Sequence, residues 1–311
     1  MELEVRIERL GAQGDGVAQG PDGPLFVPFT LPRELVKLAA EPGEPRAEAL
    51  AILDPSPKRI APVCQYFGTC GGCALQHMEA HAYLAWKREQ VVAALASRGL
   101  EAPVEDARAV PLGSRRRAAF ALGRTAHGVA FGYRGARSHD IVDIAACPVL
   151  SPAIAGRLSK LKSALVPLLG GKREARITAT ATDQGLDLVV EGIRLSPSLF
   201  AKLATAGPSL GAARITVDGE SVMLAGEPSV TLSGAQVRLP PGAFLQASRE
   251  SETVLVGLVR EGVGRAKRVA DLFAGIVTFT FALVGGAEVD AFERDEPAIA
   301  SLGRAARATA S

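Results

Sequence analysis

The sequence predicts a multi-domain protein with three successive parts. Apolar and charged residues alternate along the first strand of residues 1–54, which is typical of a small β-barrel of the oligonucleotide-binding (OB) type. Residues 55–240 contain a cysteine-rich loop followed by alternating strands and helices, which predicts an α+β domain. Residues 241–311 contain a strand, a glycine turn, a helix and a second strand, the opening of a Rossmann-like nucleotide-binding α/β unit that we expect to be incomplete. The length of 311 residues and a hydrophobic fraction of 48% allow two or three domains with real cores.

The barrel prediction depends on four short strands in the first part. Leu3, Val5 and Ile7 alternate with charged residues, and Pro28 near the end of a second strand favours a sheet edge. The predicted strands cover residues 3–7, 25–29, 34–40 and 47–53. This pattern fits a barrel that binds an oligonucleotide and a barrel without a ligand equally well.

The cysteines favour an iron–sulfur centre. The chain has four of them, three with the spacing C-x5-C-x2-C and a distant one before proline, namely Cys64, Cys70, Cys73 and Cys147. Three thiolates around small glycines, closed by a remote Cys-Pro, favour a [4Fe-4S] cluster over a zinc ion. His77 and His81 would be the spare ligands of a zinc site. Two disulfides would need an oxidising compartment, and the chain begins without a signal peptide.

In the second part, two helices are predicted to begin at Ser151-Pro152 and Ser196-Pro197, where serine caps a helix whose first residue is proline. Turns at Asp183 and Asp218 predict hairpins. The other expected elements are a helix over 79–98, strands over 115–123, 128–134 and 140–146, and hairpins over 175–191 and 213–232.

Arginines make the second part locally basic, although the net charge of the chain is only +2. They are Arg115, Arg116, Arg117, Arg124, Arg134 and Arg137. Alternate residues of a strand share a face, so Arg115 and Arg117 should point together, and guanidinium groups suit phosphates. A solvated charged face is the commoner explanation of such a run, and the neighbouring cysteine loop shifts the interpretation toward RNA.

The last part should follow the order helix 249–260, strand 268–273, glycine turn, helix 278–284 and strand 287–293. A carboxylate that ends the second strand, here Glu293, can accept hydrogen bonds from ribose hydroxyls. The phosphate-binding motif G-x-G-x-x-G is absent. The sequence therefore favours a nucleoside ligand without a pyrophosphate, such as S-adenosylmethionine, over a dinucleotide.

Together, the barrel, C-x5-C-G-G-C, the remote Cys-Pro, Phe244-x-Gln246 and Asp271-Leu-Phe-Ala-Gly275 resemble the iron–sulfur RNA uracil-5-methyltransferases. The resemblance implies that the first part is a TRAM domain and that the four cysteines ligate a [4Fe-4S] cluster. It also implies an S-adenosylmethionine site, with an RNA substrate that is ribosomal or transfer RNA. The cofactor contacts that it implies are Gln246, Phe273, Gly275, Thr278 and Glu293.

Two substitutions depart from the family pattern. Val277 stands where a second glycine is usual, and Ser248 stands where asparagine is usual. A β-branched residue disfavours positive φ, so Val277 should weaken cofactor binding.

The resemblance covers only the front of the catalytic domain, so we expect a C-terminally truncated enzyme without the catalytic cysteine and base, inactive alone. No catalytic residue is therefore assigned. A non-catalytic RNA-binding iron–sulfur protein is the alternative, and a zinc-bound regulator is a third. No apolar run spans a membrane, DNA is not an expected partner, and the context should be cytoplasmic.

Overall fold

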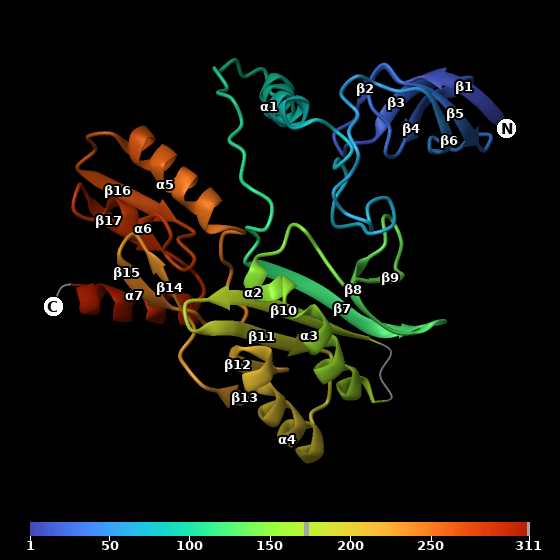
Figure 1. Cartoon of the computed structure of the whole chain (residues 1–311). Coiled ribbons are helices and arrows are strands. Elements are labelled where there is room, and N and C mark those ends of the chain that lie inside the picture. Colours follow the sequence, from blue (N-terminus) through green and yellow to red (C-terminus); the bar gives the residue numbers. More distant parts are fainter. Residues whose placement is uncertain (171–173, 310–311) are drawn as a thin grey trace. The chain divides into compact units, whose positions relative to one another are not determined.

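The computed structural model describes residues 1–170 and 174–309. The chain forms two compact units, one of residues 1–109 with 135–138, and one of residues 110–134 with 139–311 (Figure 1). None of the helices in the described residues is long and apolar enough to cross a membrane.

Two three-stranded sheets begin the first unit. Their orders are β1-β5-β6 and β2-β3-β4. The strands are β1 (Glu2–Arg6), β2 (Arg9–Leu10), β3 (Gly16–Gly20), β4 (Gly23–Val27), β5 (Leu35–Ala40) and β6 (Ala47–Asp54). One apolar core joins both sheets, because Leu25 and Val27 of β4 pack with Val36 and Leu38 of β5. The four predicted strands are confirmed, whereas β2 and β3 were not predicted; the OB or TRAM type stays a prediction.

The cysteine loop leads into the single long helix described in this unit, α1 (Ala80–Ala96). The Glu79 carboxylate caps the helix by accepting from the N–H groups of His81 and Ala82. Gly99 follows it with φ +68°, as the predicted glycine terminator requires. A second apolar cluster, which includes Leu75 and Ala82, fixes the end of the loop and the start of the helix together.

A seven-stranded sheet is the centre of the second unit, in the order β13-β12-β11-β10-β7-β8-β9. Its strands are β7 (Arg117–Thr125), β8 (Gly128–Arg134), β9 (Ile141–Asp143), β10 (Glu174–Thr182), β11 (Gly185–Glu191), β12 (Ala212–Val217) and β13 (Glu220–Leu224). The helices α2 (Pro152–Ala155), α3 (Leu158–Leu165) and α4 (Pro197–Ala206) pack near it, with short 3-10 turns over Val166–Leu169 and Gly207–Leu210 (Figure 1). The predicted strands and the hairpin over 175–191 are confirmed, although β9 is shorter than expected. The second hairpin is confirmed around its turn at Asp218, but it ends at Leu224, and residues 229–232 belong to another sheet.

The two predicted serine caps have different outcomes. The Ser196 hydroxyl accepts from the N–H of Leu199 and caps α4, as predicted. Ser151 precedes Pro152 at the start of α2, but its side chain makes no capping hydrogen bond. The fixed φ of Pro152 starts that single turn without help from the hydroxyl.

The last part of the second unit contains two small sheets. Its elements are β14 (Ser229–Leu232), β15 (Ala235–Arg238), α5 (Arg249–Val263), β16 (Arg268–Leu272), α6 (Thr280–Leu283), β17 (Glu288–Phe292) and α7 (Glu296–Thr309). β14 and β15 form an antiparallel hairpin that was not predicted separately, and β16 pairs in parallel with β17. Val230 and Val237 of the hairpin share an apolar cluster with Ile276 of the glycine loop and Ala305 of α7. The predicted order of helices and strands after residue 249 is therefore confirmed.

Candidate cofactor site and cysteine loop

The glycine loop after β16 has an unusual backbone. Phe273, Gly275 and Val277 have φ angles of +59°, +58° and +67°, so three positive-φ residues alternate within five positions. Glycine adopts this conformation at little cost, but phenylalanine and valine do not. The N–H groups of this tight loop are paired: that of Ala274 donates to the Phe292 carbonyl at 3.0 Å and that of Val277 to the Ala274 carbonyl at 2.8 Å.

Glu293, at the end of β17, closes this loop. Its carboxylate accepts hydrogen bonds from the N–H groups of Gly275 at 2.8 Å, Arg294 at 2.6 Å and Asp295 at 2.9 Å. The N–H groups of Asp295, Gly275 and Arg294 stabilise the charged form and lower the pKa of Glu293. Glu293 is therefore ionised at neutral pH. The backbone of the glycine loop and that of the two residues after Glu293 fix the orientation of its carboxylate.

A cavity of about 270 Å³ opens beside the same loop. It is lined by Ala274, Gly275, Val277, Ala291, Phe292, Glu293, Ile299 and Leu302. A Cβ atom at Gly275 would meet nothing within 4 Å, so the backbone there is open to a ligand. One carboxylate on an otherwise apolar wall suits a ligand that has hydroxyl groups on an apolar body, such as a nucleoside.

The predicted cofactor residues are brought together only in part. Gly275 and Glu293 are hydrogen-bonded and line one cavity. Phe273 is 90% exposed and Thr278 is buried, and neither lines this cavity. Gln246 is half-buried, and its neighbour Leu245 packs in the same apolar cluster as the glycine loop.

Val277 occupies its position at a structural cost. It is only 2% exposed and belongs to the apolar cluster beneath the loop. Burial of its side chain offsets part of the strain of φ +67°. The structure gives two reasons to keep the expectation that Val277 weakens cofactor binding. The valine lies in the conformation that favours glycine, and it lines the cavity.

The three clustered cysteines lie in a half-exposed loop of the first unit, and Cys147 belongs to the second unit. The N–H of Gly72 donates to Cys70 Sγ at 3.4 Å, a contact that stabilises a thiolate and suits a metal-bound sulfur. Within residues 1–170 and 174–309, no three cysteine, histidine or carboxylate side chains are grouped as metal ligands. Ligation by all four cysteines thus stays a prediction.

The hairpin tip over residues 135–138 holds the cysteine loop. Cys70 forms a bridge with Gly135, and the N–H of Ala136 donates to the carbonyl of Thr69 at 2.8 Å. The next residue, Arg137, forms an ion pair with the buried Asp15 of the β2–β3 loop. The sequence assigned Arg137 to a basic face, but here its charge is used within the first unit.

The predicted basic run divides into different environments. Arg115 is exposed, Arg117 is half-buried, and Arg116 between them is buried in an ion pair with Glu252. Burial and the neighbouring charge of Arg176 lower the pKa of Arg117, whose Nε has no hydrogen-bond partner among the described residues. One Nη of Arg117 donates to the Gly242 carbonyl at 3.5 Å, and its Nε is buried. Arg115 is therefore accessible to an anion, Arg117 is accessible only in part, and Arg116 is not accessible.

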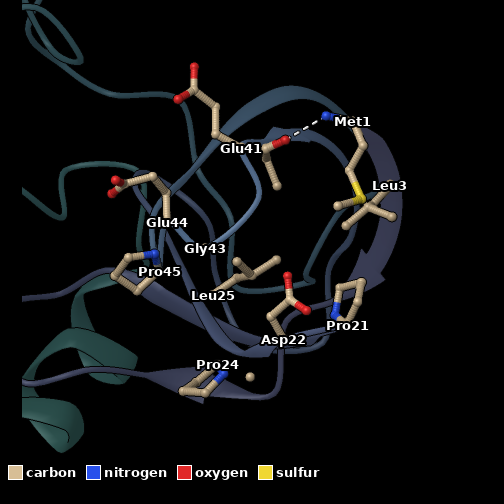
Figure 2. A pocket seen from close by; sticks show the side chains of 12 residues that line it. Met1, Leu3, Pro21, Asp22, Pro24, Leu25, Glu41, Gly43, Glu44 and Pro45 are labelled. Atoms are coloured by element: carbon tan, nitrogen blue, oxygen red, sulfur yellow. Dashed lines mark hydrogen bonds between the residues drawn. The ribbon is translucent and has the colours of Figure 1, made fainter.

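A second cavity, of about 170 Å³, lies in the first unit (Figure 2). Asp22, Glu41 and Glu44 surround an apolar floor that includes Leu25, and the Met1 amino group donates to the Ala40 carbonyl at 2.5 Å. Three carboxylates repel phosphate, so this end of the unit is unsuited to bind a nucleic-acid backbone.

Known proteins resemble this chain over nearly its whole length. An uncharacterized RNA methyltransferase of Rhizobium meliloti is 43% identical over 312 residues, which cover 98% of this chain and 75% of that protein. An RNA methyltransferase of Caulobacter vibrioides is 42% identical over 96% of this chain and 74% of its own length. The 23S rRNA (uracil(1939)-C(5))-methyltransferase RlmD of Chromohalobacter salexigens is 32% identical, covering 89% of this chain and 62% of that protein.

The fold has a solved counterpart. It matches the tRNA (uracil-54, C5)-methyltransferase of Pyrococcus abyssi, solved with S-adenosyl-L-homocysteine, with a TM-score of 0.73 over 98% of this chain and 76% of that one. The two sequences are 21% identical, so this match shows the fold alone. No protein-family model matches the chain. The relatives at 40% identity and above, matched over 73–75% of their length, show that this chain belongs to the RNA methyltransferases.

Proposed function

We propose that the chain is part of an S-adenosylmethionine-dependent enzyme that methylates C5 of uridine in ribosomal or transfer RNA. The observation that carries the cofactor assignment is the Gly275–Glu293 contact at the mouth of a cavity. The ionised carboxylate has about one acceptor site left, on Oε2, and would accept a hydrogen bond there from a ribose hydroxyl, while the open backbone at Gly275 would lie along the ligand. The uracil-specific relatives support the choice of base.

The residues present fit the nucleoside part of S-adenosylmethionine more clearly than its amino-acid part. The donor supplies an electrophilic methyl group on a sulfonium sulfur. Glu293 and the apolar wall would orient the nucleoside, while Val277 narrows the cavity on the side where the family usually has glycine. The other predicted cofactor contacts do not line this cavity, namely Phe273, Thr278 and Gln246. They would touch the ligand only if it extends beyond the cavity.

Uracil C5 is a weak nucleophile, and the family activates it by adding a cysteine thiolate to C6. The resulting enolate takes the methyl group, S-adenosylhomocysteine leaves, and a base removes the C5 proton as the thiolate is eliminated. All four cysteines of these 311 residues are assigned to a [4Fe-4S] cluster. We therefore propose that this segment binds the cofactor and RNA but contains no nucleophile.

The cluster proposal rests on the loop of Cys64, Cys70 and Cys73 with its N–H···S contact, and on Cys147 as the fourth ligand. A brown colour and broad visible absorbance after anaerobic purification would separate it from a zinc site. Replacing Cys70 with serine should lower the iron content and destabilise the loop. Full iron content in that variant would contradict the assignment.

A non-catalytic RNA-binding role is the second candidate. The observation that favours it is Val277, a buried valine at φ +67° in the middle of the cofactor loop. If this loop does not accept the cofactor even after Val277→Gly, the RNA-binding role alone would remain.

RNA binding is tested by its dependence on salt. Arg115 and Arg117 lie on either side of a buried arginine, and the charge of Arg176 lies near Arg117. If both contact phosphates, replacing both with alanine should reduce the slope of log K against log salt by roughly 0.7 to 0.9 per contact.

The matched control is Arg6→Ala with Arg268→Ala, which removes two exposed arginines that are paired with carboxylates. It changes the net charge equally but should leave the slope unchanged. An equal loss of slope in both double variants would show that net charge, rather than this site, governs RNA binding.

A further inference from the structure

Arg116 lies at the junction of the central sheet and the segment that precedes α5. It is only 3% exposed. Its N–H donates to the Ala247 carbonyl at 2.8 Å, and its own carbonyl accepts from the N–H of Ala181 at 2.7 Å. The backbone of Arg116 therefore connects the end of β10 to the residue that follows Gln246.

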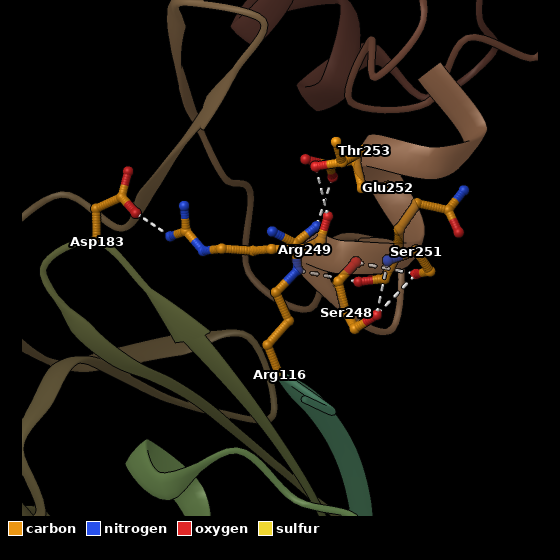
Figure 3. A network of polar contacts seen from close by, with 8 residues as sticks. Arg116, Asp183, Ser248, Arg249, Ser251, Glu252 and Thr253 are labelled. Atoms are coloured by element: carbon orange, nitrogen blue, oxygen red, sulfur yellow. Dashed lines mark hydrogen bonds and ion pairs between the residues drawn. The ribbon is translucent and has the colours of Figure 1, made fainter. Parts of the chain in front are cut away.

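The guanidinium group makes two further contacts to the same segment. Its Nε donates to the Gln246 carbonyl at 3.0 Å. One Nη donates to Glu252 Oε2 at 2.5 Å (Figure 3). Glu252 is 9% exposed and lies in the first turn of α5, where the helix dipole also stabilises its charge. One buried cation thus fixes the carbonyl before the helix and the carboxylate inside it.

The helix start has two other restraints of different kinds. Ser248 caps α5 by accepting from the N–H of Ser251 at 3.0 Å. Arg249 forms an ion pair with Asp183 in the β10–β11 turn, and its side chain is 52% exposed (Figure 3). An exposed pair contributes little, whereas a buried pair whose partner is removed leaves an uncompensated charge.

We propose that Arg116 and Glu252 form a buried clamp that positions Gln246 for the cofactor. This inference rests on the proposed function, because only there is Gln246 a cofactor contact. The clamp also fixes the start of α5 to the strand that carries Arg117, so the RNA-binding and cofactor-binding residues of the second unit share one support. Arg116 itself is a positioning residue.

The test uses the 311-residue chain with Arg116→Gln, Glu252→Gln and the milder Arg116→Lys, beside Arg249→Gln as the control for an exposed pair. Hydrogen exchange is followed by mass spectrometry over residues 243–256, and the affinity for S-adenosylhomocysteine is measured by calorimetry. The affinity is measured with and without Val277→Gly. Both glutamine variants should speed exchange at residues 246–252 by about tenfold or more while β11 and β12 stay protected.

Affinity should fall by about tenfold in the two glutamine variants and less in Arg116→Lys, which keeps the charge but not both hydrogen bonds. Arg249→Gln should match the parent in both measurements. Unchanged exchange would overturn the clamp. Faster exchange with unchanged affinity, in a parent that binds the ligand, would overturn its positioning role and leave the proposed function standing. If neither the parent nor Val277→Gly binds the ligand, the cofactor assignment fails, and the inference fails with it.

Discussion

At the scale of single residues, Val277 sets two effects against each other. Its φ of +67° is unfavourable for a β-branched residue, while its side chain is almost fully buried. In the interior of a helix, glycine is less favourable than alanine by about 1 kcal/mol. At this position we expect the reverse order, with Val277→Gly more stable than Val277→Ala by about 1 kcal/mol, because only glycine relieves the backbone strain.

Urea unfolding of the two variants measures this difference, and both should be less stable than the parent because each loses buried methyl groups. S-adenosylhomocysteine should bind more tightly to Val277→Gly than to Val277→Ala. Equal stability of the two variants would show that the backbone at residue 277 relaxes without cost.

His77 gives the first unit a dependence on pH. Burial, followed by the nearby Arg59 charge, lowers the pKa of His77 to about 4. Because the folded state favours the neutral ring, its contribution to stability is complete above the ordinary pKa of about 6.5 and is lost as the pH falls from there toward 4. The loss should reach roughly 3 kcal/mol.

Urea unfolding between pH 7.5 and 4.5, followed by fluorescence of the single tryptophan, Trp86, measures this loss. Trp86 packs against the cluster that contains Met78, next to His77 in the chain, so it reports on the same region. The control is His77→Gln, which should be less dependent on pH across that window. Glu34 carries the neighbouring negative charge. Its burial raises its pKa, but the hydrogen bonds from Arg59 and from two backbone N–H groups, together with the Arg59 charge, outweigh this and lower the pKa. Protonation of Glu34 should therefore affect stability only at a pH below the range in which His77 is protonated.

At the scale of elements, the hairpin tip over residues 135–138 should stabilise the cysteine loop. Among the residues that the structure describes, Arg137→Ala leaves the Asp15 side chain, which is 7% exposed, with the Arg46 contact at 3.7 Å as its one remaining ion pair. We expect a loss of about 2 kcal/mol in the unfolding free energy of the first unit. Exchange of amides in residues 66–72 should become faster as well.

Arg46→Ala is the matched control, because it removes the longer and half-exposed contact to the same carboxylate. Its cost should be about 1 kcal/mol or less. A larger effect of Arg46 than of Arg137 would show that the tip is not the main support of Asp15.

The sequence predicted most elements because their patterns are local. The alternation at Leu3 and Val5, the glycine after α1 and the order of β16, α6 and β17 each depend on neighbouring residues. The strands β2 and β3 were not predicted, because the glycine-rich segment around Gly16 has the composition of a loop.

The long-range contacts of the site were not predictable in the same way. Nothing in the run Arg115–Arg117 indicates that its middle residue is buried against Glu252, because that pair joins residues 136 positions apart. The same holds for Arg137 with Asp15. In contrast, the sequence placed Gly275 and Glu293 at the same predicted site, since the order of strand, glycine turn and second strand brings them to one edge of a parallel sheet. The hydrogen bond between them was not predicted.

At the scale of the whole chain, the two-stranded β16–β17 sheet leaves apolar surface exposed. Leu272 and Phe292 are partners in its register and are 61% and 55% exposed. Parallel sheets are normally covered on both faces, and their ligand sites gain walls from neighbouring strands. Phe292 of this pair also lines the cavity beside the glycine loop, so the described residues leave one wall of that cavity exposed.

These 311 residues should consequently bind RNA without methylating uridine. Two causes of inactivity are expected, namely weak cofactor binding due to Val277 and the lack of a cysteine nucleophile. They can be separated, because Val277→Gly removes the valine side chain from the cofactor loop but supplies no thiol outside the four cysteines. We expect tritiated methyl transfer to RNA that lacks 5-methyluridine to stay at the no-enzyme level for the parent and for Val277→Gly, even if the variant gains cofactor affinity. The Chromohalobacter salexigens relative, run on the same RNA, shows that the assay can detect transfer. Transfer by the parent would mean that one of the four cysteines is the nucleophile, and serine substitution of each in turn would identify it, because uracil activation needs a thiolate at C6.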